Sequence, residues 1–424
     1  MKITSDVFEA YLKSPTKCWL RSTGETSAGN TYSEWVTAQN DSYRVNETRR
    51  LVAESPNDEV VLSPDMKNFN AAKWRLASSL AVRAQMDSGV LESELHAVER
   101  VSSEGRGKHA QFIPIRFTFA NKLYLDDKLL LAFDAVVLSE MLCCDLSCGK
   151  IIQGDDHATR TVKTAALAGQ VGKIIGKIAT LLASDSPPDL VLNRHCVKCE
   201  FRDRCRQKAI EQDDLSLLSN MSEKERRKFN SKGIFSVKQL SYTFRARRRP
   251  KRLAGKREKY HHSVKALAIR ERKIHIVGNP ELELEGTPVY LDVEGIPDRE
   301  FYYLIGLRVK SAEQVIQYSL WADSVDEEKR IWIDFLEILS GIQHPVLVHY
   351  GGYETTFLKR MCSRYGEPVK DSPLSKIIKS AVNLLSFIFA QIYFPTYSNS
   401  LKEVVASLGF VWSHTNLSGP NSIA

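Results

Sequence analysis

The chain has 424 residues and a net charge of +8 at pH 7, and its 43% apolar and 26% charged residues exclude disordered and collagen-like classes. It contains no run of 18 or more apolar residues and no apolar N-terminal signal segment, so we expect no membrane span and a cytoplasmic location. The length predicts two or three domains.

The first domain is expected to be an α/β unit that covers residues 1–212. We expect residues 1–100 to be largely helical, because apolar positions there recur at helical spacing. The helices predicted in this domain cover 5–12, 71–86 and 163–183, and the strands cover 112–120, 123–125, 129–138 and 150–154. The segment 126–128, Asp-Asp-Lys, is a predicted turn between two of these strands.

A middle segment, residues 213–262, combines two short predicted helices with a basic run. The turn around Gly233 resembles that of a helix-hairpin-helix, in which backbone N–H groups bind phosphate oxygens. Nine Lys or Arg residues and one acid lie between residues 245 and 259. The residues predicted to contact phosphate, besides Gly233, are Arg245, Arg247, Arg248, Arg249, Lys251 and Arg252. The alternative is a solvated basic linker without a ligand.

A second α/β domain is predicted over residues 287–424. Its strands cover 289–294, 302–309, 315–321 and 346–349, and its helices cover 326–339 and 354–365. Strands followed by helix, strand and helix are an order typical of α/β domains.

Three cysteines lie within ten residues, in the pattern Cys196-x2-Cys199-x5-Cys205. Stable disulfides are rare in a reducing cytoplasm, so a cluster of this kind indicates metal ligands. A metal or cluster needs four ligands, and Cys18 is the expected fourth. Zinc is the alternative to an iron–sulfur cluster, with His195 as a competing ligand, and free thiols are a third interpretation.

One cysteine near the N-terminus and Cys-x2-Cys-x5-Cys at the far end of an α/β core resemble the RecB-type nucleases with an iron–sulfur staple. The wider layout resembles a bacterial family of RecB-like nucleases, in which this restriction-endonuclease-like module precedes a ribonuclease H-like exonuclease domain of the YprB type. The resemblance covers essentially the whole chain. It implies a structural four-iron, four-sulfur (4Fe-4S) cluster on Cys18, Cys196, Cys199 and Cys205.

The resemblance also implies a nuclease site in the first domain. Asp134 matches the aspartate at a strand end that binds Mg²⁺ in such nucleases. The next strand has no Glu-x-Lys, because Gln153 and Gly154 stand in its place, and Glu47 is a candidate for the upstream acid. We therefore expect degenerate or unorthodox chemistry in this domain.

Two carboxylates on the first strand of the second domain predict a metal site. Asp292 and Glu294 are one residue apart, so both side chains point to the same face and can share a metal ion. The pattern resembles the DEDD-type exonucleases of the ribonuclease H superfold, and Glu354 stands at the place of their second motif. The resemblance implies Mg²⁺ or Mn²⁺ on these three catalytic residues. The last motif is not reached before Ala424, so we expect this domain to be incomplete at its C-terminal end.

The sequence therefore predicts a metal-dependent nuclease with 3′–5′ exonuclease-like activity. Nucleic acid is the expected partner, and DNA is favoured over RNA. The alternative is a non-catalytic nucleic-acid-binding protein derived from such a nuclease.

Overall fold

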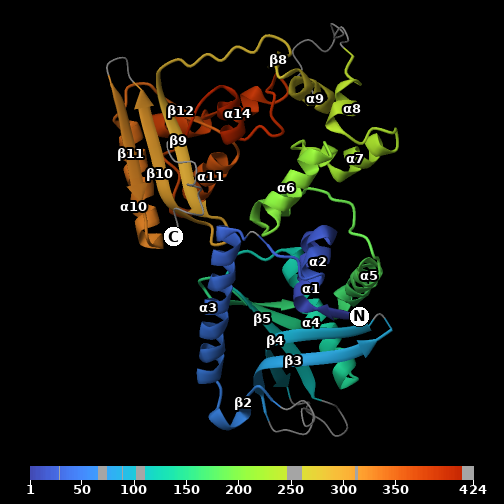
Figure 1. The fold of residues 1–424 in the computed structure, drawn as a ribbon. Helices are drawn as coiled ribbons and strands as arrows, with labels where there is room; N and C mark the ends of the chain where they lie inside the picture. Colours follow the sequence, from blue (N-terminus) through green and yellow to red (C-terminus); the bar gives the residue numbers. More distant parts are fainter. Residues whose placement is uncertain are drawn as a thin grey trace. The chain divides into compact units, whose positions relative to one another are not determined.

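The computed structural model describes residues 1–27, 29–64, 74–87, 89–101, 110–245, 260–310 and 314–412. The chain divides into two compact units, Met1–Cys205 and Arg206–Ala424. Each unit combines helices with a sheet (Figure 1), and each has its own hydrophobic core, so the architecture is mixed α/β.

Three helices open the N-terminal unit: α1 (Ser5–Lys13), α2 (Pro15–Ser22) and α3 (Thr31–Ala53). Each begins after a residue whose side chain accepts a hydrogen bond from a backbone N–H of the first turn, namely Thr4, Ser14 and Asn30. Ser14 has extended backbone angles, so it ends α1 and caps α2 at once. The two short helices are therefore separate elements.

A mixed sheet of seven strands forms the body of this unit, in the order β2-β3-β4-β5-β6-β7 with β1 beside β4. The strands are β1 (Lys2–Thr4), β2 (Val60–Leu62), β3 (Leu76–Met86), β4 (Gly89–Val101), β5 (Gln111–Thr118), β6 (Gly149–Gln153) and β7 (Ala158–Val162). The neighbours β3, β4 and β5 are antiparallel, whereas β5 and β6 are parallel. Parallel neighbours need a crossover connection, which helix α4 (Leu125–Leu142) provides.

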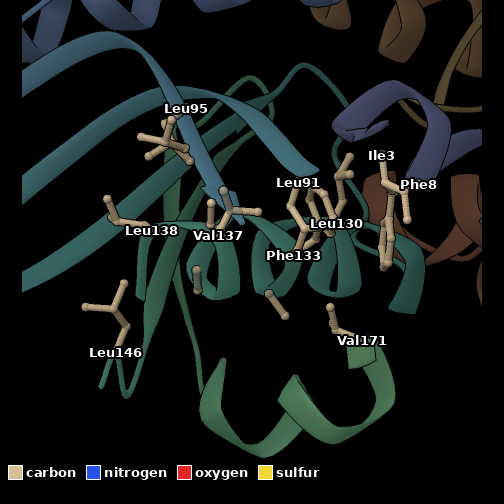
Figure 2. Packing of buried hydrophobic residues seen from close by; sticks show 14 of the residues in the cluster. Ile3, Phe8, Leu91, Leu95, Leu130, Phe133, Val137, Leu138, Leu146 and Val171 are labelled. Carbon is tan, nitrogen blue, oxygen red and sulfur yellow. The ribbon is translucent and has the colours of Figure 1, made fainter. Parts of the chain in front are cut away.

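Helix α4 lies at the centre of the N-terminal core (Figure 2). Nine of its residues are buried, and Phe133, Val137 and Leu138 share one hydrophobic cluster with Leu91 and Leu95 of β4. A helix that is apolar on every side is typical of a buried position. This helix therefore joins the sheet to the helices that surround it.

Two sets of elements predicted for this unit are wrong. Residues 129–138 form part of helix α4 and not a strand, and the predicted strand 123–125 and turn 126–128 lie at its start. A continuous apolar run has no periodicity that separates a buried helix from a buried strand. Conversely, residues 76–86 of the helix predicted over 71–86 form strand β3, in which buried Leu80 and Val82 alternate with exposed neighbours, and residues 71–73 lie outside the described residues. Among the described residues up to 100, the last α-helix is therefore α3.

Helix α5 (Ala165–Leu182) is long and apolar enough to cross a membrane, judged by length and composition alone. Its buried residues Val171, Ile175 and Ile178 recur at helical spacing and join the N-terminal core cluster. Lys173 and Lys177 of the same helix are exposed. The helix predicted over 163–183 is confirmed, and it is amphipathic.

The C-terminal unit contains a small helical module next to its sheet. Its helices are α7 (Glu223–Asn230), α8 (Val237–Ser241) and α9 (His262–Glu271), and α6 (Arg202–Glu211) precedes them. Leu215, Leu218, Val237, Leu240 and Ala266 form its core. The two short helices predicted in this segment are confirmed.

A five-stranded sheet, in the order β11-β10-β9-β12-β13, forms the rest of this unit. The strands are β9 (Thr287–Ile296), β10 (Phe301–Lys310), β11 (Val315–Trp321), β12 (Pro345–His349) and β13 (Val382–Asn383). The remaining elements are α10 (Val325–Ser340), α11 (Tyr353–Tyr365), α12 (Pro373–Lys379), α13 (Leu384–Ile388), α14 (Leu401–Ser407) and a small ladder of β8 (His275–Ile276) with β14 (Ile392–Tyr393). The six elements predicted between residues 289 and 365 are confirmed.

One face of this sheet carries the second core. Val289, Leu291 and Val293 of β9 are buried and cluster with Trp332 of α10 and Phe357 of α11. Successive strand residues point to opposite faces, so the residues between them point away from this core. The acidic pair of β9 is in that second set.

Candidate functional site

Two acidic residues stand on the central strand of the C-terminal sheet. Asp292 is paired with Gly306 of β10 and Glu294 with Leu304, so both carboxylates rise from the face opposite the hydrophobic core. Gly306 has no side chain beside Asp292, and a Cβ there would lie 3.9 Å from the Cβ of Asp292. The strand and its neighbour therefore hold both carboxylates on one open face, as the sequence predicts.

Glu354 reaches the same area from the first turn of α11, which follows strand β12. Its carboxylate is buried, with Oε2 lying 3.6 Å from Nδ1 of His349, the last residue of β12. Neither of these two atoms has a hydrogen-bond partner among the described residues. Buried polar atoms are almost always hydrogen-bonded, so an unpaired pair of this kind indicates a place prepared for a ligand.

The turn between β12 and α11 is held rigidly. Gly351 has a φ of +113°, which side chains rarely tolerate. The side-chain amide of Asn383 forms two hydrogen bonds with the backbone of Gly351. Gly351 N donates to Asn383 Oδ1 at 3.2 Å, and Asn383 Nδ2 donates to Gly351 O at 2.7 Å. The start of α11, and with it Glu354, is therefore fixed relative to the neighbouring strand.

The three carboxylates influence one another electrostatically. Burial raises the pKa of Asp292, and the charge of Glu354 raises it further. Burial also raises the pKa of Glu294, together with the charges of Asp292 and Glu354, while Lys402 of α14 lowers it. A bound cation stabilises closely spaced negative charges such as those of Asp292 and Glu294.

The carboxylates do not form a complete metal site by themselves. Among the residues that the structure describes, no three His, Cys, Asp or Glu side chains lie close enough together to hold a metal ion. The arrangement thus provides oxygen ligands of the kind that Mg²⁺ and Mn²⁺ prefer, near one another but not in a coordination sphere.

A buried lysine organises the loop that leads into α14. Lys265 of α9 is 0% exposed, and its ammonium group donates to Phe394 O at 3.0 Å, Thr396 Oγ1 at 3.1 Å and Asn399 Oδ1 at 2.8 Å. Tyr350 Oη, next to the turn after β12, donates to Asn399 O at 2.7 Å. The charge of Lys402, in the helix after this loop, acts on Glu294, so its position depends on a residue more than one hundred positions away in the chain.

Replacing Lys265 by Met is expected to lower the free energy of unfolding by about 2–4 kcal/mol, because the buried acceptors in this loop lose their donor. Burial lowers the pKa of Lys265 to about 8. The unfolded chain therefore binds more protons between about pH 8 and pH 10, and the stability of the wild type should rise with pH in that window. Thermal melting at several pH values measures both effects. The exposed Lys273→Met is the control, and an equal loss in both variants would contradict this role.

Asp134 occupies a different place from the predicted strand end. It lies on helix α4, is 2% exposed, and receives hydrogen bonds from Arg116 at 2.8 and 3.0 Å and from Ser93 at 2.6 Å. Arg116 of β5 faces α4, whereas its neighbours Ile115 and Phe117 pack on the opposite face. The acid is therefore the partner of a buried arginine, with both oxygens engaged.

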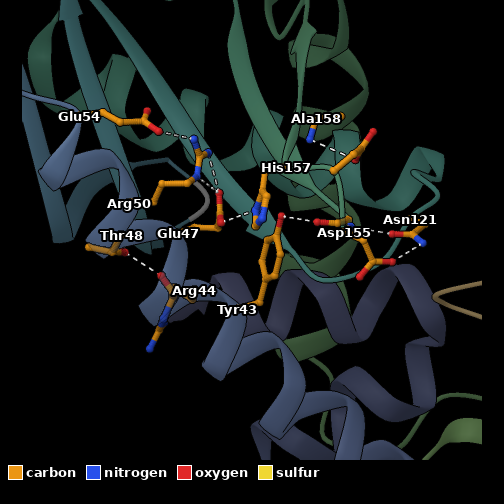
Figure 3. Close-up of polar contacts among 12 residues, drawn as sticks. Tyr43, Arg44, Glu47, Thr48, Arg50, Glu54, Asn121, Asp155, His157 and Ala158 are labelled. Carbon is orange, nitrogen blue, oxygen red and sulfur yellow. Dashed lines mark hydrogen bonds and ion pairs between the residues drawn. The ribbon is translucent and has the colours of Figure 1, made fainter. Parts of the chain in front are cut away.

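Glu47 is likewise engaged inside the N-terminal unit (Figure 3). One oxygen lies 2.6 Å from Nδ1 of His157 and the other 2.7 Å from Arg50, and the side chain is 1% exposed. Tyr43 Oη donates to Gly154 O at 2.9 Å. These contacts fasten the turn between β6 and β7 to α3, so they account for Glu47 without a metal.

The cysteines predicted as ligands lie in two segments that contact each other. Glu200 pairs with Lys17 and Arg21 of α2, each at 2.8 Å, and these residues flank Cys18. Burial opposes ionisation of Glu200, but the hydrogen bond and charge of Lys17, with Arg21, lower its pKa to about 2. The segment that contains the other three cysteines is therefore held against the helix of the first.

The four thiols are not equivalent. Cys18 is 0% exposed, and burial raises its pKa to about 12, whereas Cys196, Cys199 and Cys205 are partly exposed. Burial, with the charge of Lys13, lowers the pKa of the neighbouring His195. The sulfur atoms do not form a metal-binding group among the described residues.

The predicted phosphate-binding turn is closed. Gly233 N donates to Asn230 O, Val237 N donates to Asp213 O, and Lys238 N donates to a carboxylate oxygen of Asp213 at 2.7 Å. The backbone amides of Gly233, Val237 and Lys238 are therefore engaged within the chain, and Asp213 accepts two of these hydrogen bonds. Arg245 is exposed, and the other basic residues predicted to contact phosphate, Arg247, Arg248, Arg249, Lys251 and Arg252, lie outside the described residues.

Sequence reasoning missed three members of the C-terminal site: His349, Lys402 and Tyr353. The hydroxyl of Tyr353 would lie 2.6 Å from a Cβ on Gly295, so only glycine fits there, directly after Glu294. The only local sign that His349 belongs to the site is its position at the end of a buried strand, shortly before Glu354. Lys402 is an ordinary residue of a short amphipathic helix, and no sequence signal distinguishes it.

Comparison with known proteins assigns the C-terminal part of the chain. Residues 289–424 match the model of the RNase_H superfamily, so the C-terminal unit contains an RNase H superfamily domain, a fold of nucleic-acid enzymes. Comparison with curated proteins found no match. A solved structure titled "Crystal structure of SSO0001" aligns over 49% of this chain and 86% of that chain, at 14% identity and a TM-score of 0.28. At that TM-score the match supports no conclusion about this chain.

Proposed function

We propose that this protein is a metal-dependent nuclease whose chemistry resides in the C-terminal unit. The observation that carries the proposal is the pair Asp292 and Glu294 on the open face of the central strand, electrostatically coupled to Glu354 inside an RNase H superfamily domain. We further propose DNA as the substrate and 3′–5′ exonuclease-like cleavage, on the resemblance to DEDD-type exonucleases.

The carboxylates and the unpaired Oε2 of Glu354 fit a hard divalent cation. Asp292, Glu294 and Glu354 would hold Mg²⁺ or Mn²⁺, which stabilises negative charge on phosphate oxygens and activates water. His349 lies 3.6 Å from the Glu354 carboxylate at the end of β12, and the positive charge of Lys402 acts on Glu294. The open face beside Gly306 admits the backbone of the substrate.

A labelled DNA strand incubated with the full chain in Mg²⁺ or Mn²⁺ tests the proposal. Metal-dependent shortening of the strand from its 3′ end supports it. Tight binding of the strand without cleavage in either metal would support the other function, a nucleic-acid-binding protein that has lost its chemistry. The two engaged acids of the N-terminal unit, Asp134 and Glu47, favour a non-catalytic role for that unit in either case.

We also propose that the N-terminal unit is a RecB-type module that holds a 4Fe-4S cluster on Cys18, Cys196, Cys199 and Cys205. The support is the donor set of four thiols and the ion pairs that hold their two segments together. Thiolates are the usual ligands of iron–sulfur clusters. The basic segment 245–259 is proposed to bind phosphates through its side chains.

Anaerobically purified protein is expected to be brown and to contain about four irons per chain. Cys199→Ala should lose the iron and destabilise the N-terminal unit, because cluster affinity contributes to folding. Cys143→Ala, which removes an exposed thiol outside the set, should keep both iron and stability. Iron analysis and visible absorption measure the outcome. Colourless protein that holds one zinc would contradict the cluster.

A further inference from the structure

The face that carries Asp292 and Glu294 continues across two more strands. Two rows of residues cross the strands β9, β10 and β11. One row consists of Asp292, Gly306 and Ser319, and the other consists of Glu294, Leu304 and Trp321. Residues opposite each other on antiparallel strands point to the same side. The surface formed in this way has further members at Tyr290, Arg308, Lys310 and Gln317.

Two large aromatic side chains stand out from this surface. Tyr290 is 39% exposed and Trp321 is 49% exposed. The ring of Trp321 is held in place by Tyr303, with a centroid distance of 6.2 Å. Exposed aromatic rings on a sheet stack with the faces of unpaired bases, which a double helix keeps inside. The surface is therefore suited to a single strand and not to a duplex.

Two cations lie on the same surface. Arg308 and Lys310 of β10 are exposed, and neither makes an ion pair within the described ranges of the chain. From Gly306, beside Asp292, to Arg308 the strand advances by two residues, or roughly 7 Å. This advance is comparable to the separation of neighbouring phosphates in an extended strand. The positive charges thus complement a polyanion that starts at the carboxylates.

We propose that this face binds a single strand of nucleic acid along β10, with one phosphate at Asp292 and Glu294 and the following phosphates at Arg308 and Lys310. Bases of the strand stack on Tyr290 and Trp321. The inference rests on the proposed nuclease function, and it assigns the substrate as single-stranded. We call these residues, Tyr290, Gly306, Arg308, Lys310 and Trp321, the strand track.

The test measures how tightly the full chain binds a labelled single strand of about 16 nucleotides. Fluorescence anisotropy monitors the binding at several salt concentrations, and EDTA removes divalent metal ions so that the strand is not cleaved. Arg308→Ala should weaken binding about tenfold and flatten the salt slope by about 0.7. Trp321→Ala should weaken binding about tenfold with an unchanged slope, and Trp321→Phe should retain most of the affinity. Lys329→Ala removes an exposed cation from α10 and should leave both quantities unchanged.

Wild-type affinity in both Arg308→Ala and Trp321→Ala would overturn the strand track, even if Asp292→Asn abolishes cleavage. Weaker binding by these variants, together with cleavage that is insensitive to Asp292→Asn, would leave the strand track in place and overturn the nuclease site. A duplex that binds as tightly as the single strand and is equally sensitive to Trp321→Ala contradicts stacking. Altered self-association of the variants without altered strand affinity would assign the face to protein contacts and also overturn the proposal.

Discussion

Replacing Asp292 by Asn is expected to reduce metal-dependent cleavage by about 100-fold or more. The substitution keeps the size of the side chain but removes the charge of the residue that lies on the central strand, paired with Gly306. A metal ion contributes several kcal/mol of charge stabilisation in phosphodiester cleavage, and about 1.4 kcal/mol corresponds to each factor of ten in rate. The measurement is the rate of strand shortening under single-turnover conditions.

The rate of cleavage is also expected to depend on which divalent metal ion is present. Mg²⁺ demands near-ideal octahedral geometry, and the coupled carboxylates Asp292, Glu294 and Glu354 supply few ligands for it. We therefore expect faster cleavage in Mn²⁺ than in Mg²⁺, with the same loss in Asp292→Asn in both metals.

Asp326→Asn is the matched control, because Asp326 is an exposed acid on α10 of the same unit. Its cleavage rate should equal that of the wild type. Brisk cleavage by Asp292→Asn would show that the catalytic site lies elsewhere in the chain. Binding of the strand by Asp292→Asn should persist, which separates a chemical defect from a misfolded unit.

Replacing Asp134 by Asn is expected to destabilise the protein by about 3–5 kcal/mol without affecting cleavage below the melting temperature. Arg116 is mostly buried, and the substitution leaves it without a counter-ion. Removing one partner of a buried ion pair is costly, because the remaining charge stays away from water. For a unit of this size the loss corresponds to a melting temperature lower by roughly 6–20 °C. Scanning calorimetry of the full chain measures it.

Asp126→Asn is the control for this substitution. Asp126 lies on the same helix and pairs with Lys13 at 2.7 Å, but both side chains are about one quarter exposed, so the loss should stay below about 1 kcal/mol. Replacing Asp134 by Leu and Arg116 by Met together should recover much of the stability, since both charges are then removed. A fully stable Asp134→Asn protein with impaired cleavage would instead place Asp134 in a catalytic site.

The second sheet was predictable from the sequence because its signals are local. In β9, apolar and polar residues alternate over a short span, and α10 and α11 have clear apolar stripes. The alternation also places Asp292 and Glu294 on the face opposite the core. Glu354 follows from its position after β12, so the acidic members of the site were predictable as well.

The first unit was less predictable for the opposite reason. Helix α4 is apolar on nearly all sides, since it is enclosed by the sheet and by other helices, and its sequence therefore lacks a period. The alanine and leucine residues of β3 favour a helix locally, but pairing with β4 along its whole length decides for a strand. The elements that enclose α4, and the strand that pairs with β3, cannot be identified from the sequence of α4 or of β3 alone.

The sequence by itself determined the alternating strands, the amphipathic helices and the acidic residues of the C-terminal site, because each depends on neighbours within a few positions. Only the tertiary structure decided which charged groups are already engaged. Asp134 meets Arg116, Asp213 closes the turn around Gly233, and Lys265 holds the loop before Lys402. These pairings join residues that are 18 to 134 positions apart. Contacts at such separations arise from packing and leave no periodic trace in the chain.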